Sequence, residues 1–422
     1  MNKLTQTLIF ASIISAPALA FADGAPAKLA VPTLSDVLDA SGIVMTGYID
    51  FAYNHMNSTG LQQGGVPSRI FDTPGALRGQ NFNSFNLQQA AVFISKTPKE
   101  GLGGLVNITS GQDAPGVAAN GLGLGNPNHF TDLTQAYASY ATGPATVIAG
   151  KYTTLAGAEY IASPMNKNYS RAWMFGWGPY THTGVRTTYV ASDVVTLIGG
   201  INNGWDQVAP IQGAPGKTAE LGLVLTPSTM FSLATTYLNG KEGSLTSPTA
   251  NAGPLTVNAA GLAVPASTSV GTIGTRSYLD MVGTINATDK LNFVFDYANG
   301  SQSNVSLLNR VTPTSLAAPV QAKWDALALY ANYQFTDVWR LSYRHETFND
   351  KNGFRSGLLI NGAATGQKLG SNTLTVGYAL DKKWELRGEV RYDHSTQNAF
   401  LMSNNTAANN QHSYAVQALY QF

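Results

Sequence analysis

The sequence contains no cysteine, which excludes a disulfide framework, a thiolate metal site and a cysteine nucleophile. Charge is also scarce, since charged residues make up 12% of the 422 residues, about half the share of an average soluble protein. Apolar runs of about 18 or more residues, which membrane-spanning helices need, do not occur. The formal net charge is only +1, so a nucleic-acid partner, which would favour a basic excess, is not indicated.

Glycine, uncharged polar residues and aromatic residues are abundant, whereas charged residues are few. The chain has 43 Gly, 10% aromatic residues and a mean hydropathy of −0.05. This composition favours an all-β transmembrane barrel, whose wall faces lipid on one side and water on the other. The soluble alternatives are a large β-sandwich or a β-solenoid, whose outward faces would carry more charge.

Residues 1–22 are predicted to be a secretory signal peptide. Lys3 supplies a positive start, an apolar core follows, and two small-x-small cleavage sites end at Ala20 and Ala22. An N-terminal membrane anchor is the alternative, but the apolar run is short and Pro17 interrupts it. The pattern therefore predicts export.

Residues 23–42 are predicted to be an N-terminal tail with a short amphipathic helix. Thr33 and Asp36 resemble a capping box, and Gly42 supplies a stop. A frayed tail is the alternative, because so short a helix is marginal on its own.

Residues 43–422 are predicted to form the barrel, because apolar and polar side chains alternate with a period of two. One such segment alternates Leu291, Phe293 and Phe295 with Asn292 and Asp296. The alternation continues to the last residue, and a final strand that ends in an aromatic residue is typical of the assembly signal of outer-membrane proteins. Tyr420 and Phe422 are the residues predicted to carry that signal.

Short turns and long polar segments follow one another along the chain. Seven short turns are predicted, at 97–101, 142–144, 191–193, 226–228, 287–289, 336–337 and 380–382. Eight long polar segments alternate with these turns, at 56–81, 112–129, 153–178, 203–216, 241–274, 301–321, 350–367 and 395–410. The asymmetry predicts an antiparallel up-and-down barrel of about 16 strands, with short periplasmic turns and long extracellular loops.

Two segments carry a resemblance to a known family. The strand Gly47-Tyr48-Ile49-Asp50 and the segment from Phe175 to Arg186 are similar to those of the OmpL-like β-barrel porins. The resemblance implies a bacterial outer-membrane protein that passes solutes by passive diffusion, with outer-membrane lipid and the barrel assembly machinery as partners. Trimers are common among proteins that the chain resembles, so a homotrimer is left open.

Enzyme motifs are incomplete. Gly216-Lys217-Thr218 imitates the end of a phosphate-binding loop, but Ile211 stands where that loop needs its first glycine. His345-Glu346 starts a zinc-protease motif without its second histidine. No catalytic residue, cofactor or metal ion is predicted, although a hydrolase site at the barrel rim stays an alternative.

Charged residues that alternate with lipid-facing apolar residues should face the lumen, because Arg or Lys on the lipid face would cost about 2–4 kcal/mol near the midplane. We expect them to line water and to orient polar solutes. The alternative is a salt-bridged ladder that stiffens the wall. The predicted lumen residues are Arg186, Arg340, Arg344, Glu346, Glu385, Arg387, Glu389 and Arg391.

The segment 153–178, between the fifth and sixth predicted strands, is too apolar for a loop in water. It is predicted to fold into the barrel as a constriction, with Glu159, Lys167 and Arg171 facing the charged rows opposite. The alternative is packing on neighbouring loops or on another subunit.

The sequence thus predicts a porin for small hydrophilic solutes or ions. A barrel that anchors adhesive or structural surface loops is the alternative.

Overall fold

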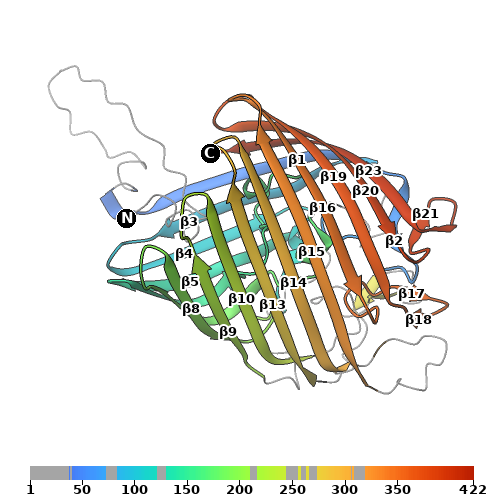
Figure 1. Ribbon diagram of the computed structural model, residues 1–422, viewed down its shortest axis with the longest axis horizontal. Coiled ribbons are helices and arrows are strands. Elements are labelled where there is room, and N and C mark those ends of the chain that lie inside the picture. The colour runs from blue at the N-terminus through green and yellow to red at the C-terminus, as the bar shows by residue number, and fades with distance from the viewer. Residues whose placement is uncertain are drawn as a thin grey trace.

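The computed structural model describes residues 38, 40–72, 83–120, 130–209, 216–243, 255–257, 263–265, 273–305, 307 and 319–422. Within these residues, sixteen antiparallel strands form one closed barrel, so the predicted fold is confirmed. Each barrel strand pairs with its neighbours along the chain, and the first strand pairs with the last (Figure 1). In the same part of the chain, the helices are all too short or too polar to cross a membrane.

The barrel strands are between 8 and 15 residues long. The first eight are β1 (Val44–Met56), β3 (Ser84–Lys96), β4 (Gly101–Ser110), β5 (Thr131–Thr142), β6 (Ala145–Thr153), β7 (Thr181–Val190), β8 (Val195–Asn202) and β9 (Thr218–Leu225). The other eight are β10 (Phe231–Gly243), β13 (Ile273–Asn286), β14 (Leu291–Val305), β15 (Val320–Gln334), β16 (Trp339–Asp350), β19 (Gln367–Ala379), β20 (Trp384–Ser395) and β23 (Asn410–Gln421).

Short elements lie in the long connections. They are β2 (Ser58–Gln62), α3 (Ala114–Val117), η2 (Ser163–Met165), α4 (Trp173–Gly176), β11 (Leu255–Val257), β12 (Ala263–Pro265), β17 (Leu359–Ile360), β18 (Ala363–Ala364), β21 (Phe400–Met402) and β22 (Ala407–Ala408). All seven predicted short turns lie between consecutive barrel strands. The long connections therefore share the opposite end of the barrel.

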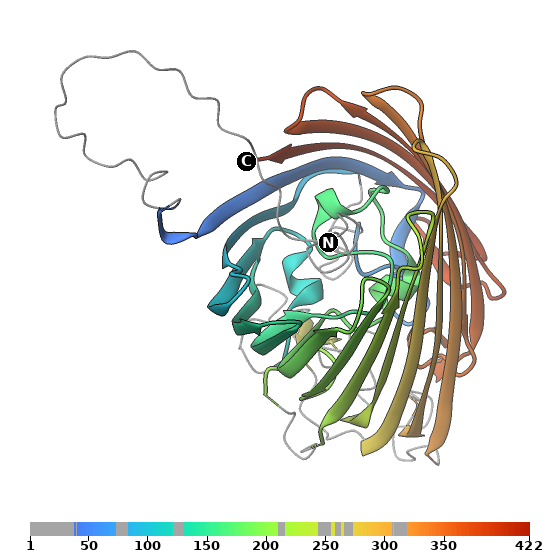
Figure 2. The same cartoon turned by 60° about the vertical axis from the view of Figure 1, so that its left-hand side comes forward.

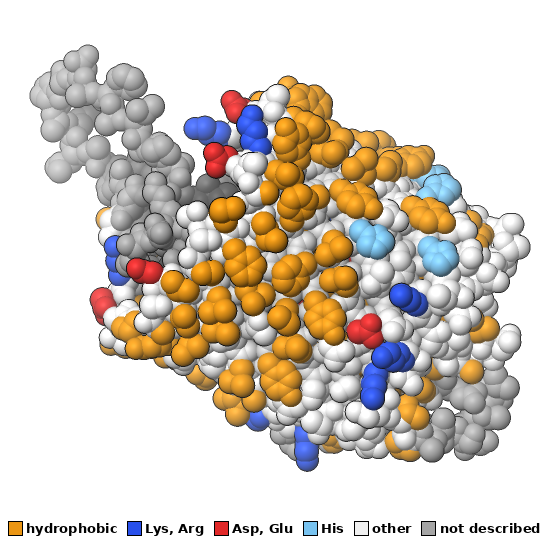
Figure 3. Space-filling model, viewed as in Figure 1, with side chains coloured by type: hydrophobic (Ala, Val, Ile, Leu, Met, Phe, Trp, Pro, Cys, Tyr) orange, Lys and Arg blue, Asp and Glu red, His pale blue; other side chains and the backbone are white. Residues whose placement is uncertain are grey.

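The period of two separates the two faces of each strand. On β16, Arg340, Ser342 and Arg344 are buried, whereas Trp339 and Tyr343 are exposed. The exposed residues belong to an apolar band on the outer surface (Figure 3). Aromatic pairs across neighbouring strands mark the turn end of this band, as interfacial girdles do in membrane barrels. The band is the surface that lipid covers.

The barrel closes where β1 meets β23. The Gly47 backbone N–H donates to the Phe422 carbonyl at 2.9 Å, and the Phe422 N–H donates back to Gly47 at 3.0 Å. A Cβ atom at position 47 would lie 2.4 Å from the Phe422 ring, so only glycine fits there. The terminal ring also lies 5.9 Å from that of Tyr420. The chain end is thus part of the closing ladder.

The predicted N-terminal segments are largely outside the described residues. The signal peptide at 1–22 lies wholly outside them, as do residues 23–37 and 39 of the predicted tail. Leu38, Ala40 and Ser41 are helical, and Gly42, with a φ of +67°, follows them. The segment then enters β1.

Deletion of Phe422 is expected to lower the amount of barrel assembled in the outer membrane. The variant loses both the terminal aromatic ring and the last pair of hydrogen bonds between β1 and β23. Heat-modifiable barrel in membrane fractions, quantified by gel mobility, measures this. Gln421→Ala is the control, because it keeps the aromatic end and should assemble nearly normally. Equal assembly of both variants would show that Phe422 is not read as a signal.

Candidate functional site

The connection between β6 and β7, residues 154–180, runs inside the barrel. Figure 2 shows its short helical turns within the ring of strands. Its apolar centre, from Trp173 to Trp177, is almost fully buried. Because apolar side chains lose contact with water there, the segment is stable inside and not outside the wall. We call residues 154–180 the inner loop.

Carboxylates on the wall bind the first part of the inner loop through its backbone N–H groups. Gly157 donates to Asp280 on β13 at 2.7 Å, and Ala158 donates to Asp296 on β14 at 2.7 Å. These acids are nearly inaccessible to water. Backbone donors on a tight inward segment have few other partners, so the acids satisfy groups that would otherwise be buried without one.

Two glutamates bind the second part of the inner loop in the same way. Glu389 on β20 accepts from Tyr169 at 2.7 Å and from Ser170 at 3.0 Å. Glu346 on β16 accepts from Trp173 at 2.7 Å. Hydrogen bonds to an ionised acceptor are roughly twice as strong as neutral ones. The carboxylates therefore fix the path of the loop backbone across the lumen.

Arginines bind the carbonyl groups of the same loop. The hydrogen bonds join Arg387 to Ser163 (3.3 Å), Arg340 to Lys167 (2.7 Å), Arg344 to Ser170 (2.7 Å), Arg391 to Arg171 (2.6 Å) and Arg355 to Trp177 (3.0 Å). Acids and arginines together act as a clamp on the backbone. Wall carboxylates hold the N–H groups, whereas the C=O groups are held by four wall arginines and by Arg355 from the connection after β16.

The three charged loop residues predicted from the sequence have different surroundings. Glu159 forms a buried ion pair with Arg344 on the opposite wall, with 2.6 Å between the charged atoms. Arg171 turns back instead and donates to the carbonyls of its own loop, at Tyr160 (3.0 Å), Ile161 (3.1 Å) and Tyr169 (2.9 Å). The side chain of Lys167 is exposed. Glu159 therefore pairs with the charged rows, and Lys167 lies close enough to Arg340 and Glu385 for their charges to act on it. Arg171 differs from the expectation, because the tight loop offers it nearer acceptors.

The predicted lumen residues on β16 and β20 point inward, and most of them form two chains of ion pairs. Their links are Arg340 with Glu385, Glu385 with Arg387 (2.8 Å), Arg344 with Glu346 (3.9 Å), Glu346 with Arg391 (3.1 Å) and Arg391 with Asp393 (2.7 Å). Arg186 lies on the other wall, where it binds Glu220 at 2.7 Å and covers the Tyr152 ring at 4.1 Å. The charges therefore form the salt-bridged ladder that the sequence analysis gave as the alternative.

These rows are covered by the inner loop and not by water. Arg344 is 0% exposed, and only Glu385, with 20% of its side chain exposed, keeps substantial contact with solvent. The expectation that the whole row lines water is therefore corrected, and the reason is the hydrogen-bonding demand of the loop backbone. Glu385 and Lys167 lie toward the turn end of the barrel, where the described lumen stays accessible.

Other loops pack against the inner loop in the half of the barrel nearer the long connections. The Phe71 ring lies 5.3 Å from Phe175 and 5.6 Å from Tyr180, and Val117 of α3 joins this cluster. A second cluster joins the stacked rings of Trp173 and Trp177 to wall residues. Sequence reasoning missed this packing, although the apolar residues inside predicted loops were a usable signal.

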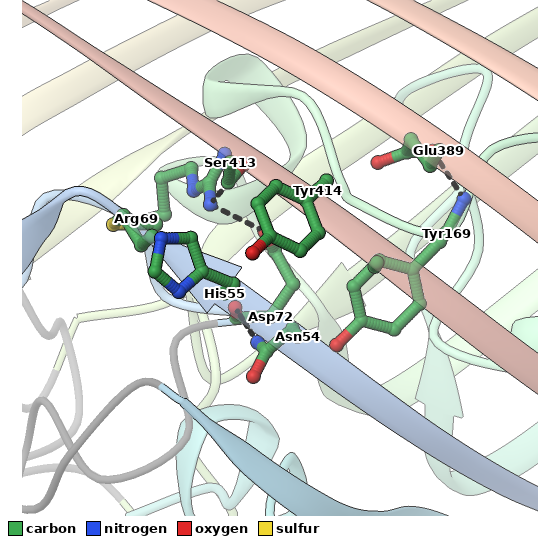
Figure 4. Close-up of a pocket in the computed structure, with 10 residues that line it drawn as sticks. Asn54, His55, Arg69, Asp72, Tyr169, Glu389, Ser413 and Tyr414 are labelled. Carbon is green, nitrogen blue, oxygen red and sulfur yellow. Dashed lines mark hydrogen bonds and ion pairs between the residues drawn. The ribbon is translucent and has the colours of Figure 1, made fainter.

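A small cavity separates the inner loop from the wall at β1 and β23. Figure 4 shows Tyr169 reaching from the loop toward Asn54 and Asp72. Arg69 lies 3.0 Å from Asp72 and 3.4 Å from Asp393, so it ties the connection after β1 to the wall. Burial raises the pKa of Asp72 to about 6, despite the neighbouring guanidinium.

Two further loop carboxyls are buried beside the inner loop. Asp113 accepts from Gln89 at 2.8 Å, and Asp206 accepts from the Tyr180 and Thr181 backbone at 2.9 and 2.8 Å. Burial raises the pKa of both carboxyls to about 7. In the described part of the chain, His, Asp and Glu side chains do not gather in groups of three that could hold a metal ion.

Replacing Glu389 with Gln is expected to loosen the clamp. Amide exchange at Tyr169 and Ser170 should become about fivefold faster, because a charged acceptor adds about 1 kcal/mol over a neutral one. Hydrogen exchange followed by mass spectrometry measures this. Glu242→Gln is the matched control, because Glu242 on β10 is a buried glutamate that accepts from the Trp205 backbone N–H at 3.1 Å in another connection. Unchanged exchange at both amides of the Glu389→Gln variant would refute the clamp.

Comparison with solved structures places the fold among outer-membrane channels. OmpT of Vibrio cholerae in its trimer form has a TM-score of 0.55 at 12% identity, covering 90% of this chain and 99% of that one. The DcaP channel of Acinetobacter baumannii has a TM-score of 0.57 at 11% identity, with 90% and 97% covered. The anion-selective porin of Comamonas acidovorans has a TM-score of 0.54 at 10% identity, with 90% and 99% covered. At these identities the likeness shows the fold alone.

A search of curated protein sequences finds no match. A family model does match, over residues 40–422, which is nearly all of the chain that follows the predicted signal peptide and tail. The sixteen-stranded barrel and the matched range agree with the resemblance seen in the sequence. The chain belongs to the family described as "Putative beta-barrel porin-2, OmpL-like".

Proposed function

We propose that the barrel carries small hydrophilic solutes or ions across the outer membrane by passive diffusion, and that the inner loop is its constriction. The observation that supports this most is the clamp of wall charges on the loop backbone. A loop held by acids from β13, β14, β16 and β20 stays across the lumen and narrows it. Catalysis has no part in this proposal.

The electrostatics of the remaining gap favour polar solutes. Glu385 and Arg340 on the wall, together with Lys167 on the loop, present both signs of charge near the turn end. Opposite charges across a narrow, low-dielectric passage produce a strong transverse field. Such a field orients dipolar solutes and disfavours apolar ones.

One observation favours the alternative function, a barrel that anchors surface loops. Phe71, Val117, Phe175 and Tyr180 pack into one buried apolar cluster in the half of the barrel nearer the long connections. A solute would need these loops to move apart before it could pass. Conduction distinguishes the two functions, because an anchor needs none.

Assembly and partners complete the proposal. We propose export by the signal peptide that the pattern of residues 1–22 predicts, and insertion by the barrel assembly machinery with Tyr420 and Phe422 as the signal. A homotrimer is proposed from what the chain resembles. The trimer form of OmpT from Vibrio cholerae supports the homotrimer.

Purified full-length protein in a planar bilayer should conduct ions in discrete steps. Glu159→Ala with Arg171→Ala should change the single-channel conductance and the cation-to-anion preference, because the variant removes the ion pair to Arg344 and the internal bonds of the loop. The matched control is Asp289→Ala with Lys290→Ala, which removes the same two charges at a short turn outside the lumen. Absence of steps would favour the anchor, and normal steps unaffected by the loop variant would refute the constriction.

Conductance is also expected to rise between pH 5 and pH 8. Burial favours the neutral form of Asp72, Asp113 and Asp206 and so raises the pKa of each carboxyl. Their stabilising contribution is complete below the ordinary carboxyl pKa of about 3.9 and is lost as the pH rises through 6 to 7. The packed loops should therefore loosen at higher pH.

The triple variant Asp72→Asn, Asp113→Asn and Asp206→Asn provides the comparison for this pH dependence. It carries neutral side chains throughout, so its conductance should stay at the low-pH level of the parent. Single-channel recordings across the pH range measure both proteins. A parent conductance that falls with rising pH would contradict the assignment.

A further inference from the structure

A pattern of outward-facing side chains recurs on one side of the barrel, and it has no role in the lumen or in the loops. A tyrosine and a histidine, separated by a single inward residue, occur on four strands. The pairs are Tyr53 and His55 on β1, Tyr343 and His345 on β16, Tyr392 and His394 on β20, and His412 and Tyr414 on β23. Because β23 runs in the opposite direction, the histidine is nearer the long connections in every pair.

The four strands are neighbours, with β19 between β16 and β20. The strand register places Asn372 of β19 opposite both His345 and Tyr392, and places Tyr392 opposite His412. Tyr343 donates to the Asn372 side-chain oxygen at 2.6 Å, and the His345 Nδ1 atom lies 3.0 Å from that oxygen. The His55 and Tyr414 rings stack at 4.6 Å. The pairs therefore form a continuous row around this side.

Lysines lie beyond the histidines, nearer the long connections. Lys323 on β15, Lys351 after β16 and Lys368 on β19 are exposed on the outer surface. Lys351 lies 3.4 Å from Asp325, which is the one acid on this outer region among the described residues. Three lysines against one aspartate leave two positive charges unbalanced. We call the four histidines and three lysines the basic belt.

The belt begins where the apolar band ends. Figure 3 shows histidine side chains beside the border of the apolar surface, with basic side chains farther from its centre. On the same strands, outward residues toward the turns are apolar or aromatic, such as the half-buried Leu341 and the exposed Val390 and Val416. Tyrosine at the border is typical of a membrane–water interface, so the histidines and lysines lie at the depth of lipid headgroups.

We propose that the basic belt binds the phosphate groups of anionic lipids in the outer leaflet. Lysine ammonium groups and imidazole N–H groups donate to phosphate oxygens, and the tyrosine rings below them contact the upper part of the acyl chains. Charge complementarity argues for this occupant, because the belt carries an excess of positive charge that an apolar subunit interface would disfavour. This lipid-binding proposal requires that the barrel is inserted in the membrane, and it does not require that the barrel conducts.

The test uses full-length protein in phosphatidylcholine vesicles that contain a minor fraction of phosphatidic acid, which carries a phosphate monoester. Native mass spectrometry counts the phosphatidic acid molecules that stay bound after extraction. One variant replaces His55, His345, His394 and His412 with Gln, and another replaces Lys323, Lys351 and Lys368 with Gln. The control replaces Lys217, directly before β9, and Lys241 on β10 with Gln, since both are exposed near the long connections elsewhere on the barrel.

The lysine variant should retain about one tenth or less of the phosphatidic acid that the parent retains, because each lysine near an anionic surface contributes substantially to binding. The histidine variant should also lose lipid, whereas the control should match the parent. Excess inorganic phosphate should not displace the lipid. Displacement by free phosphate would overturn the lipid assignment, as would equal retention in all variants. A changed oligomeric mass with unchanged lipid retention would show instead that this face contacts a second copy.

Discussion

The inner loop must satisfy its backbone hydrogen bonds inside the barrel, and the charged residues of the wall are arranged around that need. A backbone N–H without a partner in a low-dielectric interior costs as much as a lost hydrogen bond. Asp280, Asp296, Glu346 and Glu389 meet this demand for the N–H groups, and arginines meet it for the carbonyls. The clamp therefore determines which wall charges remain available to a solute.

The clamp also explains how so many buried charges are tolerated. Isolated charges in an apolar interior are costly, but Arg344 binds Glu159, two loop oxygens and Thr373 at the same time. Removing one partner would leave the others uncompensated. The charged rows and the inner loop thus depend on each other.

The lipid-facing and lumen-facing sides of the same strands carry side chains with different roles. In Tyr343-Arg344-His345, the outward tyrosine and histidine belong to the lipid border, while the inward arginine belongs to the clamp. A strand with a period of two allows each face to change independently. A basic belt for lipid and a charged lumen can therefore coexist on β16, β20 and their neighbours.

Local chemistry made the fold predictable from the sequence. The alternation of side chains and the short turns act residue by residue, because the lipid face excludes charge and tight turns need particular residues. The strand number and the seven turns follow from these patterns, whereas the family was indicated by the resemblance of two short segments. The apolar content of 153–178 also indicated that this segment avoids water.

Only the tertiary structure decided the contacts of the inner loop. Gly157 meets Asp280 across 123 positions of sequence, and Trp173 meets Glu346 across 173. Such pairs depend on barrel closure and on the path of the loop, which no local pattern specifies. Arg171 shows the limit of prediction from sequence. Its charge predicted a partner on the wall, but the turn of its own backbone supplies nearer carbonyl acceptors.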